Sequence, residues 1–125
     1  IMNENPNIDT VCANGVYQWP ISTVFYDTYA ILEKDDHFHI DNKAMHDIVK
    51  SLKFKYFLGE EPIDVESCFS GFAIYRTKCL LAPNVYYDMT PDPNNIECEH
   101  TRLNKKISGK KIVNPSMINL IVLNV

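Results

Sequence analysis

Short apolar segments of strand length alternate along this chain with two segments of helical pattern, and this alternation constrains the fold more than any other feature. The strand-like segments are residues 8–13, 65–75, 112–113 and 118–125. The helical patterns are 41–53, with Asp41 as N-cap, and 94–107, where Asn94 and Glu97 have the spacing of a capping box. The order strand, helix, strand, helix, strand is typical of an α/β chain, which is the predicted fold class.

The connections between these segments are also predicted from local signals. Asn14-Gly15 is a turn signal that should end the first strand, and Ser70-Gly71 inside the buried strand 65–75 should mark a bulge or a close approach of another group. The remaining expectations are an aromatic loop at 17–20, a strand or short helix at 25–32, a polar turn at 35–39, a short helix at 77–81 and a long loop at 83–93.

Length and charge exclude several classes of protein. With 125 residues the chain is long enough for one ordinary domain and too short for two. The 12 basic against 16 acidic residues give a formal net charge of −4, which argues against a nucleic-acid partner. The longest apolar stretch, residues 117–125, is too short to span a membrane, and no signal peptide is visible. A membrane partner is therefore not expected, and the predicted location is cytoplasmic.

The four cysteines do not form a CxxC pair, so the usual structural zinc knuckle is absent. They are Cys12, Cys68, Cys79 and Cys98. The favoured interpretation is a reducing compartment with buried free thiols, although a disulfide between any two of the four stays open. Cys68, among apolar neighbours, is expected to be an inert core residue rather than a nucleophile.

The segment from Glu97 to His100 is the densest group of reactive side chains. Two carboxylates in the first turn of a helix can simply complement the helix dipole. Alternatively, Glu99 points into a cleft and acts as a general base, because modest burial would raise its pKa toward neutrality. Asp27, in an apolar setting, needs a structural partner or a polar ligand. Trp19 and its neighbours Tyr17 and Tyr26 suit either sugar or base stacking or an ordinary core.

Three ordered motifs go further than these patterns. They are residues 11–15 (VCANG) followed by 25–30 (FYDTYA), residues 66–76 (ESCFSGFAIYR), and residues 97–104 (ECEHTRLN) followed by 112–117 (IVNPSM). Their order and spacing resemble certain glycosyltransferases of the GT-A fold, including capsule-type mannosyltransferases and viral or bacterial relatives. The resemblance covers residues 8–117, nearly the whole chain, and implies a mixed Rossmann-like sheet with flanking helices.

The resemblance also implies transfer of a sugar from a nucleotide-sugar donor to a hydroxyl of a glycan or protein acceptor. Ser70 and Gly71 would match the family's glycine loop beside the sugar, and Glu99 the acidic residue that deprotonates the acceptor in inverting members. Asp27 would lie near donor or acceptor. With Asp27, Ser70 and Gly71 we group Trp19 and His100 as predicted substrate-binding residues, and Glu99 is the predicted catalytic residue.

Two departures from the family pattern qualify this resemblance. The family usually holds Mg²⁺ or Mn²⁺ on the diphosphate with an Asp-x-Asp motif, and this chain contains none. A divalent metal is therefore expected in the complete enzyme, with no ligand supplied by motifs of this chain. The nucleotide-binding units should precede Ile1, so residues 1–125 are expected to be one incomplete, acceptor-side domain that is inactive alone. The edge exposed by such a cut makes a homo-oligomer conceivable.

Two other hypotheses remain open at this point. The absence of a complete catalytic constellation is also typical of a small non-catalytic α/β binding or structural protein. A metal hydrolase could use Asp36, His37, His39 and His100, although residues 35–39 are more simply a solvated turn.

Overall fold

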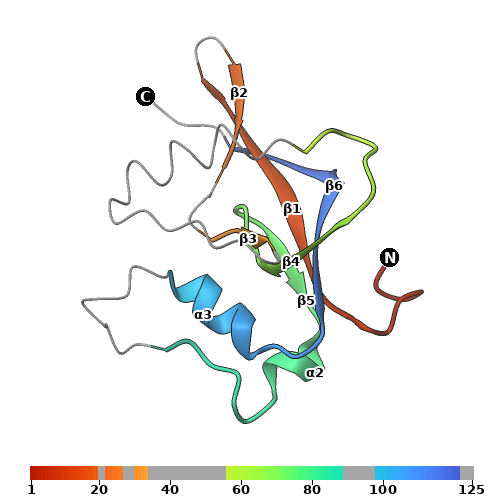
Figure 1. Ribbon diagram of the computed structural model, residues 1–125, viewed down its shortest axis with the longest axis vertical. Coiled ribbons are helices and arrows are strands. Elements are labelled where there is room, and N and C mark those ends of the chain that lie inside the picture. The colour runs from red at the N-terminus through yellow and green to blue at the C-terminus, as the bar shows by residue number, and fades with distance from the viewer. Residues whose placement is uncertain (20–21, 27–29, 34–55, 89–97, 122–125) are drawn as a thin grey trace.

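The computed structural model describes residues 1–19, 22–26, 30–33, 56–88 and 98–121 (Figure 1). In this part of the chain the strands are β1 (Ile8–Trp19), β2 (Ser22–Phe25), β3 (Leu32–Glu33), β4 (Ile63–Ser67), β5 (Ala73–Tyr75) and β6 (Lys110–Ile121). The helices are α2 (Thr77–Leu80) and α3 (Glu99–Lys106). One sheet accompanied by helices confirms the predicted α/β class.

The six strands form a single mixed sheet. Its order is β2-β1-β6-β4-β3, and β5 pairs with β1. The central pair, β1 and β6, is parallel, whereas every other pairing is antiparallel. Figure 1 shows β1 and β6 side by side along the molecule, with α2 and α3 gathered toward one end of this pair. The long parallel pair is therefore the frame on which the other elements are placed.

β1 continues through Asn14-Gly15, so the predicted turn at this position is wrong. The Asn14 side chain is buried, and its Nδ2 donates to the carbonyl oxygens of Tyr56 (2.8 Å) and Pro115 (3.2 Å). An amide whose NH₂ group donates in this way to two other segments has no need of a local turn. Gly15 stays extended within the strand, and the backbone of Ser70 lies directly against it.

The predicted aromatic loop at 17–20 is also wrong for the residues that the structure describes. Tyr17 and Trp19 belong to β1, where they pair with Val24 and Ser22 of β2 in an antiparallel hairpin. The rings of Tyr17 and Tyr26 pack edge to face, with centroids 6.2 Å apart. Aromatic residues fit a pleated strand well, and cross-strand pairing prevails here over the loop signal.

The C-terminal segment forms one strand where two were predicted. β6 pairs Asn114 with Ala13 and then Ile118 with Asn14, so three residues of β6 bulge out between these pairs. Pro115 lies within this bulge, where its missing N–H removes no ladder hydrogen bond. Pro115, which favours the prediction of two separate strands, is thus accommodated without ending β6.

The opposite error occurs at residues 65–75, where one strand was predicted and the structure has two. β4 ends at Ser67 after pairing with β6, and β5 begins at Ala73 on the far edge of β1. The chain turns between them at Ser70 (φ 58°) and Gly71 (φ 76°), which both lie in the left-handed region. Two such residues in sequence cannot continue a strand, so the polypeptide crosses from one side of the β1–β6 pair to the other.

Both faces of the sheet are buried near its centre. Cys12, Val65 and Val113 belong to one apolar cluster, which also contains Ile31 and Cys68. The neighbouring strand residues face the other way and form a second cluster of Ile8, Val11 and Ile112, covered by Met2 and Met117. Burial on both faces is typical of paired parallel strands and explains the continuous apolar runs in the sequence.

The helical predictions are confirmed where the structure describes the chain. α2 spans Thr77–Leu80 against the predicted 77–81, and α3 spans Glu99–Lys106 inside the predicted 94–107. Glu99 in the first turn of α3 and two lysines in its last turn complement the helix dipole. The helix predicted at 41–53, the turn at 35–39 and the capping box at 94–97 lie outside the described residues.

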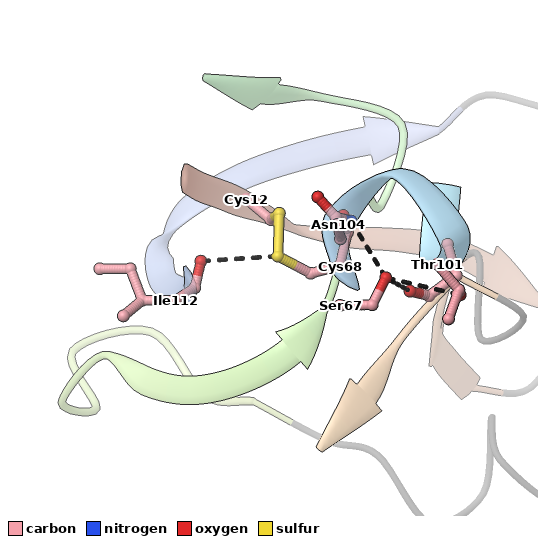
Figure 2. Close-up of a disulfide and its surroundings, with 7 residues drawn as sticks. Cys12, Ser67, Cys68, Thr101, Asn104 and Ile112 are labelled. Atoms are coloured by element: carbon pink, nitrogen blue, oxygen red, sulfur yellow. Dashed lines mark hydrogen bonds between the residues drawn. A yellow bond between two sulfur atoms is a disulfide. The ribbon is translucent and has the colours of Figure 1, made fainter. Parts of the chain in front are cut away.

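A disulfide joins Cys12 of β1 to Cys68, the first residue after β4 (Figure 2). The expectation of free thiols is therefore wrong for these two residues, whose Cα atoms lie 5.9 Å apart, within the usual range for a disulfide. The Cys68 sulfur lies 3.7 Å from the carbonyl oxygen of Ile112, marked by a dashed line in Figure 2. A bonded sulfur has no hydrogen to donate, so we regard this as a packing contact. Cys79 and Cys98 are buried and form no disulfide, as predicted.

In the described ranges, none of the helices has the length and apolar character that crossing a membrane requires.

Gly15→Ala is expected to lower the free energy of unfolding by about 2–3 kcal/mol, because the added Cβ would clash with the Ser70 carbonyl oxygen. That oxygen belongs to backbone, so relief requires β1 and the turn at residues 70–71 to separate. Denaturant unfolding measures the change. Gly59→Ala is the control: it has positive φ but nothing within 4 Å, and should cost only about 1 kcal/mol. An equal or smaller loss for Gly15→Ala would contradict the packing argument.

Candidate functional site

The turn from Phe69 to Phe72 is the most strained segment of the described backbone. Its two central residues both have positive φ, and the N–H of Phe72 donates to the carbonyl oxygen of Phe69 at 3.3 Å. For Ser70 this conformation costs about 1–2 kcal/mol, because a side chain crowds the backbone there. Ser70 is also fully buried, and its Oγ has no hydrogen-bond partner among the described residues. Strain and an unsatisfied buried hydroxyl often occur together at functional sites.

One side of this turn is held by β6 and by the residue that follows β2. The Asn119 side chain donates from Nδ2 to the Ser70 carbonyl oxygen at 3.2 Å. A Cβ added to Gly71 would lie 2.8 Å from the same nitrogen and 3.3 Å from the ring of Tyr26. Gly71 is therefore needed both for its positive φ and for the close approach of these side chains.

On the other side, α3 is attached to the start of the turn by buried polar groups (Figure 2). Asn104 donates from Nδ2 to Ser67 Oγ (3.0 Å) and to the Cys68 carbonyl oxygen (2.9 Å). Ser67 Oγ in turn donates to the Ala30 carbonyl oxygen at 2.7 Å and lies 3.5 Å from Thr101 Oγ1. This network fixes α3 against the end of β4, and so fixes the helix start relative to the turn.

The first turn of α3 brings His100 onto the turn. The His100 and Phe69 rings are stacked with centroids 3.9 Å apart and planes 10° apart. On its edge His100 meets Tyr87, whose hydroxyl oxygen lies 3.2 Å from Nδ1. Burial lowers the pKa of His100 more than the nearby Glu99 carboxylate raises it, so the ring is held toward its neutral form.

Glu99 precedes His100 and lies at the open side of the site. Its Oε1 is 4.0 Å from His100 Nε2, and its side chain is 61% exposed. The burial that would turn this carboxylate into a strong base is therefore not provided by the described residues alone. A bound acceptor would have to provide it by displacing water from the carboxylate.

The structure thus brings together four of the six residues predicted to form the site. Ser70 and Gly71 lie in the turn, and Glu99 and His100 lie at the start of α3, joined to the turn through Phe69. Trp19 ends β1 in the hairpin with β2, and its side chain is outside the described part, as is the whole of Asp27. Their predicted roles remain predictions.

Three contributors to the site were missed in the sequence. Phe69 and Tyr87 looked like ordinary aromatic residues, because contact with His100 depends on the tertiary fold and has no signature in spacing. Asn119 carried a weak signal, since it is an amide inside the apolar segment 118–125. A partly buried amide needs a hydrogen-bond partner, and here the partner is the strained turn.

The described residues give no set of donors for a metal ion. No group of three or more His, Cys, Asp or Glu side chains comes together among them. Glu99 and His100 are two donors, too few for the divalent site implied by the family resemblance. Of the residues named for a metal hydrolase, Asp36, His37 and His39 lie outside the described chain and only His100 is inside.

Asn104→Ala is expected to lower the free energy of unfolding by about 2–3 kcal/mol, because it leaves the buried Cys68 carbonyl oxygen without its side-chain donor. It should also loosen α3 over the turn. Thermal or denaturant unfolding measures the first effect. Asn84→Ala, the same change at an exposed loop position, should stay within about 0.5 kcal/mol of wild type. Equal stabilities of the two variants would mean that the network does not hold α3 in place.

Comparisons with known proteins identify no relative: no family model, no curated protein and no solved structure matches this chain.

Proposed function

We propose that this chain is the acceptor-side part of a glycosyltransferase with a GT-A-like fold. In this proposal, the complete protein transfers a sugar from a nucleotide-sugar donor to the hydroxyl of a glycan or protein acceptor. Glu99 is the general base, and Ser70 and Gly71 lie beside the sugar. Trp19, Asp27 and His100 complete the substrate-binding set.

The single observation that carries the proposal is the meeting of two motifs about thirty residues apart. The motif of residues 66–76 forms the strained turn, and the motif of residues 97–104 forms the start of α3. Stacking of Phe69 on His100 and the bonds from Asn104 join them. A sugar-binding turn beside a candidate base is the arrangement that a transferase needs. The mixed sheet, with one parallel central pair, supports the same fold.

The proposed chemistry is a direct displacement at the anomeric carbon. The Glu99 carboxylate accepts the proton of the acceptor hydroxyl, and the oxygen forms a bond to the anomeric carbon. The bond from that carbon to the diphosphate breaks, and the nucleoside diphosphate leaves with the electron pair. In the complete enzyme a divalent ion held outside the described residues would neutralise the diphosphate.

The exposure of Glu99 also favours a second candidate, a non-catalytic binding module. A carboxylate that is 61% exposed, near the exposed ring of Tyr87, could contact a sugar without chemistry. Such a module would retain its affinity for a glycan when Glu99 is changed to Gln, because the side chain keeps its shape and its hydrogen-bonding oxygen.

The experiment that tests the proposal uses the complete product of the gene. It is incubated with a panel of nucleotide sugars and simple glycan acceptors in the presence of Mn²⁺ or Mg²⁺. Release of nucleoside diphosphate that depends on the acceptor, with a glycosylated product in the mass spectrum, is the expected result. Failure to turn over any donor, combined with tight binding of a glycan, would replace the proposal by the binding module.

A cytoplasmic location for the protein remains part of the proposal, and fractionation of cells tests it.

A further inference from the structure

Tyr87 contacts His100, and the proposed chemistry assigns no role to this contact. This residue lies in the loop before α3, outside the motifs that carry the family resemblance. Its hydroxyl oxygen is 3.2 Å from His100 Nδ1, within hydrogen-bond range, and its ring meets the imidazole edge-on at 5.8 Å between centroids. Together with the stacked Phe69, it encloses the imidazole from the face and from one edge. The ring plane of His100 is therefore fixed by two aromatic neighbours.

The arrangement of charges decides which nitrogen of His100 carries the proton. A neutral imidazole has one N–H, and its position follows the partners of the two nitrogens. The Glu99 carboxylate lies 4.0 Å from Nε2 and can only accept, so it favours the proton on Nε2. Nδ1 is then the acceptor, and the Tyr87 hydroxyl must be the donor. Burial raises the pKa of Tyr87, so the hydroxyl keeps the proton that it donates.

The local environment keeps this arrangement in its neutral form. Among the described residues, the groups that face the ring and can carry charge are the Glu99 carboxylate on α3 and the hydroxyl of Tyr87, which is neutral, on the preceding loop. Burial of the ring outweighs the attraction of Glu99 and lowers the pKa of His100. A neutral ring donates one proton, from Nε2, in the direction of the carboxylate.

We propose that Tyr87 is a positioning residue: its hydroxyl holds His100 as the Nε2–H tautomer, and that N–H orients the Glu99 carboxylate toward the acceptor hydroxyl. The separation of 4.0 Å is longer than a hydrogen bond, so the carboxylate approaches the ring when the acceptor binds, as catalytic contacts often do. The catalytic part of this proposal rests on the proposed function, whereas the tautomer does not.

The tautomer is measured by ¹⁵N NMR of the imidazole nitrogens at about pH 8, where a ring of ordinary or lowered pKa is neutral. His100→Gln identifies the signals of His100 among those of the four histidines. In the wild type we expect an Nε2 signal of the protonated type and an Nδ1 signal of the unprotonated, hydrogen-bonded type. In Tyr87→Phe the Nδ1 signal should move to the position of an unprotonated nitrogen without a donor.

Tyr86→Phe is the matched control. Tyr86 is the neighbouring tyrosine, but its contacts run to Lys106, whose Nζ lies 3.7 Å above the ring and donates to the backbone oxygen. Tyr86→Phe should leave the His100 signals unchanged. A wild-type proton on Nδ1, or equal spectra for the two Tyr→Phe variants, would overturn the proposal.

The catalytic consequence is measured in the complete protein under the transfer assay. Tyr87→Phe should lower kcat by roughly fivefold to tenfold, the effect of one hydrogen bond, with KM for the donor unchanged. Tyr86→Phe should leave kcat unchanged, and equal kcat values for wild type and Tyr87→Phe would remove the positioning role. If the tautomer is as inferred and no sugar is transferred, the proposed function fails and the positioning role with it, but the hydrogen-bonded arrangement stands.

Discussion

Reduction of the Cys12–Cys68 disulfide is expected to lower the free energy of unfolding by about 4 kcal/mol. The cross-link closes a loop across a sequence separation of 56, and the chain-entropy relation assigns a loop of that size about this value. The sulfurs also occupy the apolar cluster with Val65 and Val113, so reduction places two thiols where one compact bridge had packed. A loss of this size is a large fraction of the stability of an ordinary small domain.

Urea unfolding with and without a phosphine reductant measures this difference. The variant with both Cys12→Ala and Cys68→Ala is the control, because it should be destabilised in buffer and should not respond further to the reductant. Cys79 and Cys98 form no disulfide, so they contribute no redox-dependent change. Coincident unfolding curves for the oxidised and reduced wild type would show that the cross-link does not stabilise the fold.

The same bond shows where the sequence was informative and where it was not. Apolar content made burial of all four cysteines predictable, and each of them is buried. Pairing was not predictable, because Cys12 and Cys68 meet only after β1 and β4 have taken their places on either side of β6. Cysteine count and spacing carry no information about such long-range geometry.

Predictions from local sequence signals are correct where interactions between neighbouring residues decide the structure. α2 and α3 follow from helical patterning and end charges, and both are present in the described chain. Such predictions are wrong at Asn14-Gly15 and at Pro115, where residues that usually end a strand lie inside one. At Asn14 two long-range acceptors bind the side-chain NH₂ group, and at Pro115 a bulge removes the need for an N–H. In both places tertiary contacts prevail over turn propensity.

The sequence motifs predicted which residues form the candidate site, but they did not predict the residues that hold these in place. Ser70, Gly71, Glu99 and His100 were named from the order of short motifs. Phe69, Tyr87 and Asn119, which hold them together, depend on contacts between segments that only the folded chain brings together. Positioning residues in general act through geometry, which leaves little trace in composition or spacing.

Glu99→Gln is expected to lower kcat for sugar transfer by about 10²–10⁴-fold in the complete protein, because general base catalysis contributes a factor of this size. Gln has the shape of Glu but cannot accept the proton of the acceptor hydroxyl. KM for the nucleotide sugar should stay close to wild type, since the changed group acts on the acceptor. Stability should change by less than about 1 kcal/mol, because the side chain is largely exposed and its interactions with the helix dipole and with His100 are weakened by solvent.

Glu66→Gln is the matched control, since it makes the same change at an exposed carboxylate on β4 between the buried residues Val65 and Ser67. It should retain wild-type kcat and stability. The same small loss in both variants would leave Glu99 without a role in proton transfer, and unchanged glycan affinity in both would then favour the binding module. A loss confined to Glu99→Gln, with a folded protein and unchanged donor binding, can arise only if this carboxylate takes part in the reaction. The strained turn and the stacked His100 would then be the structural reason why it lies where the acceptor hydroxyl must be deprotonated.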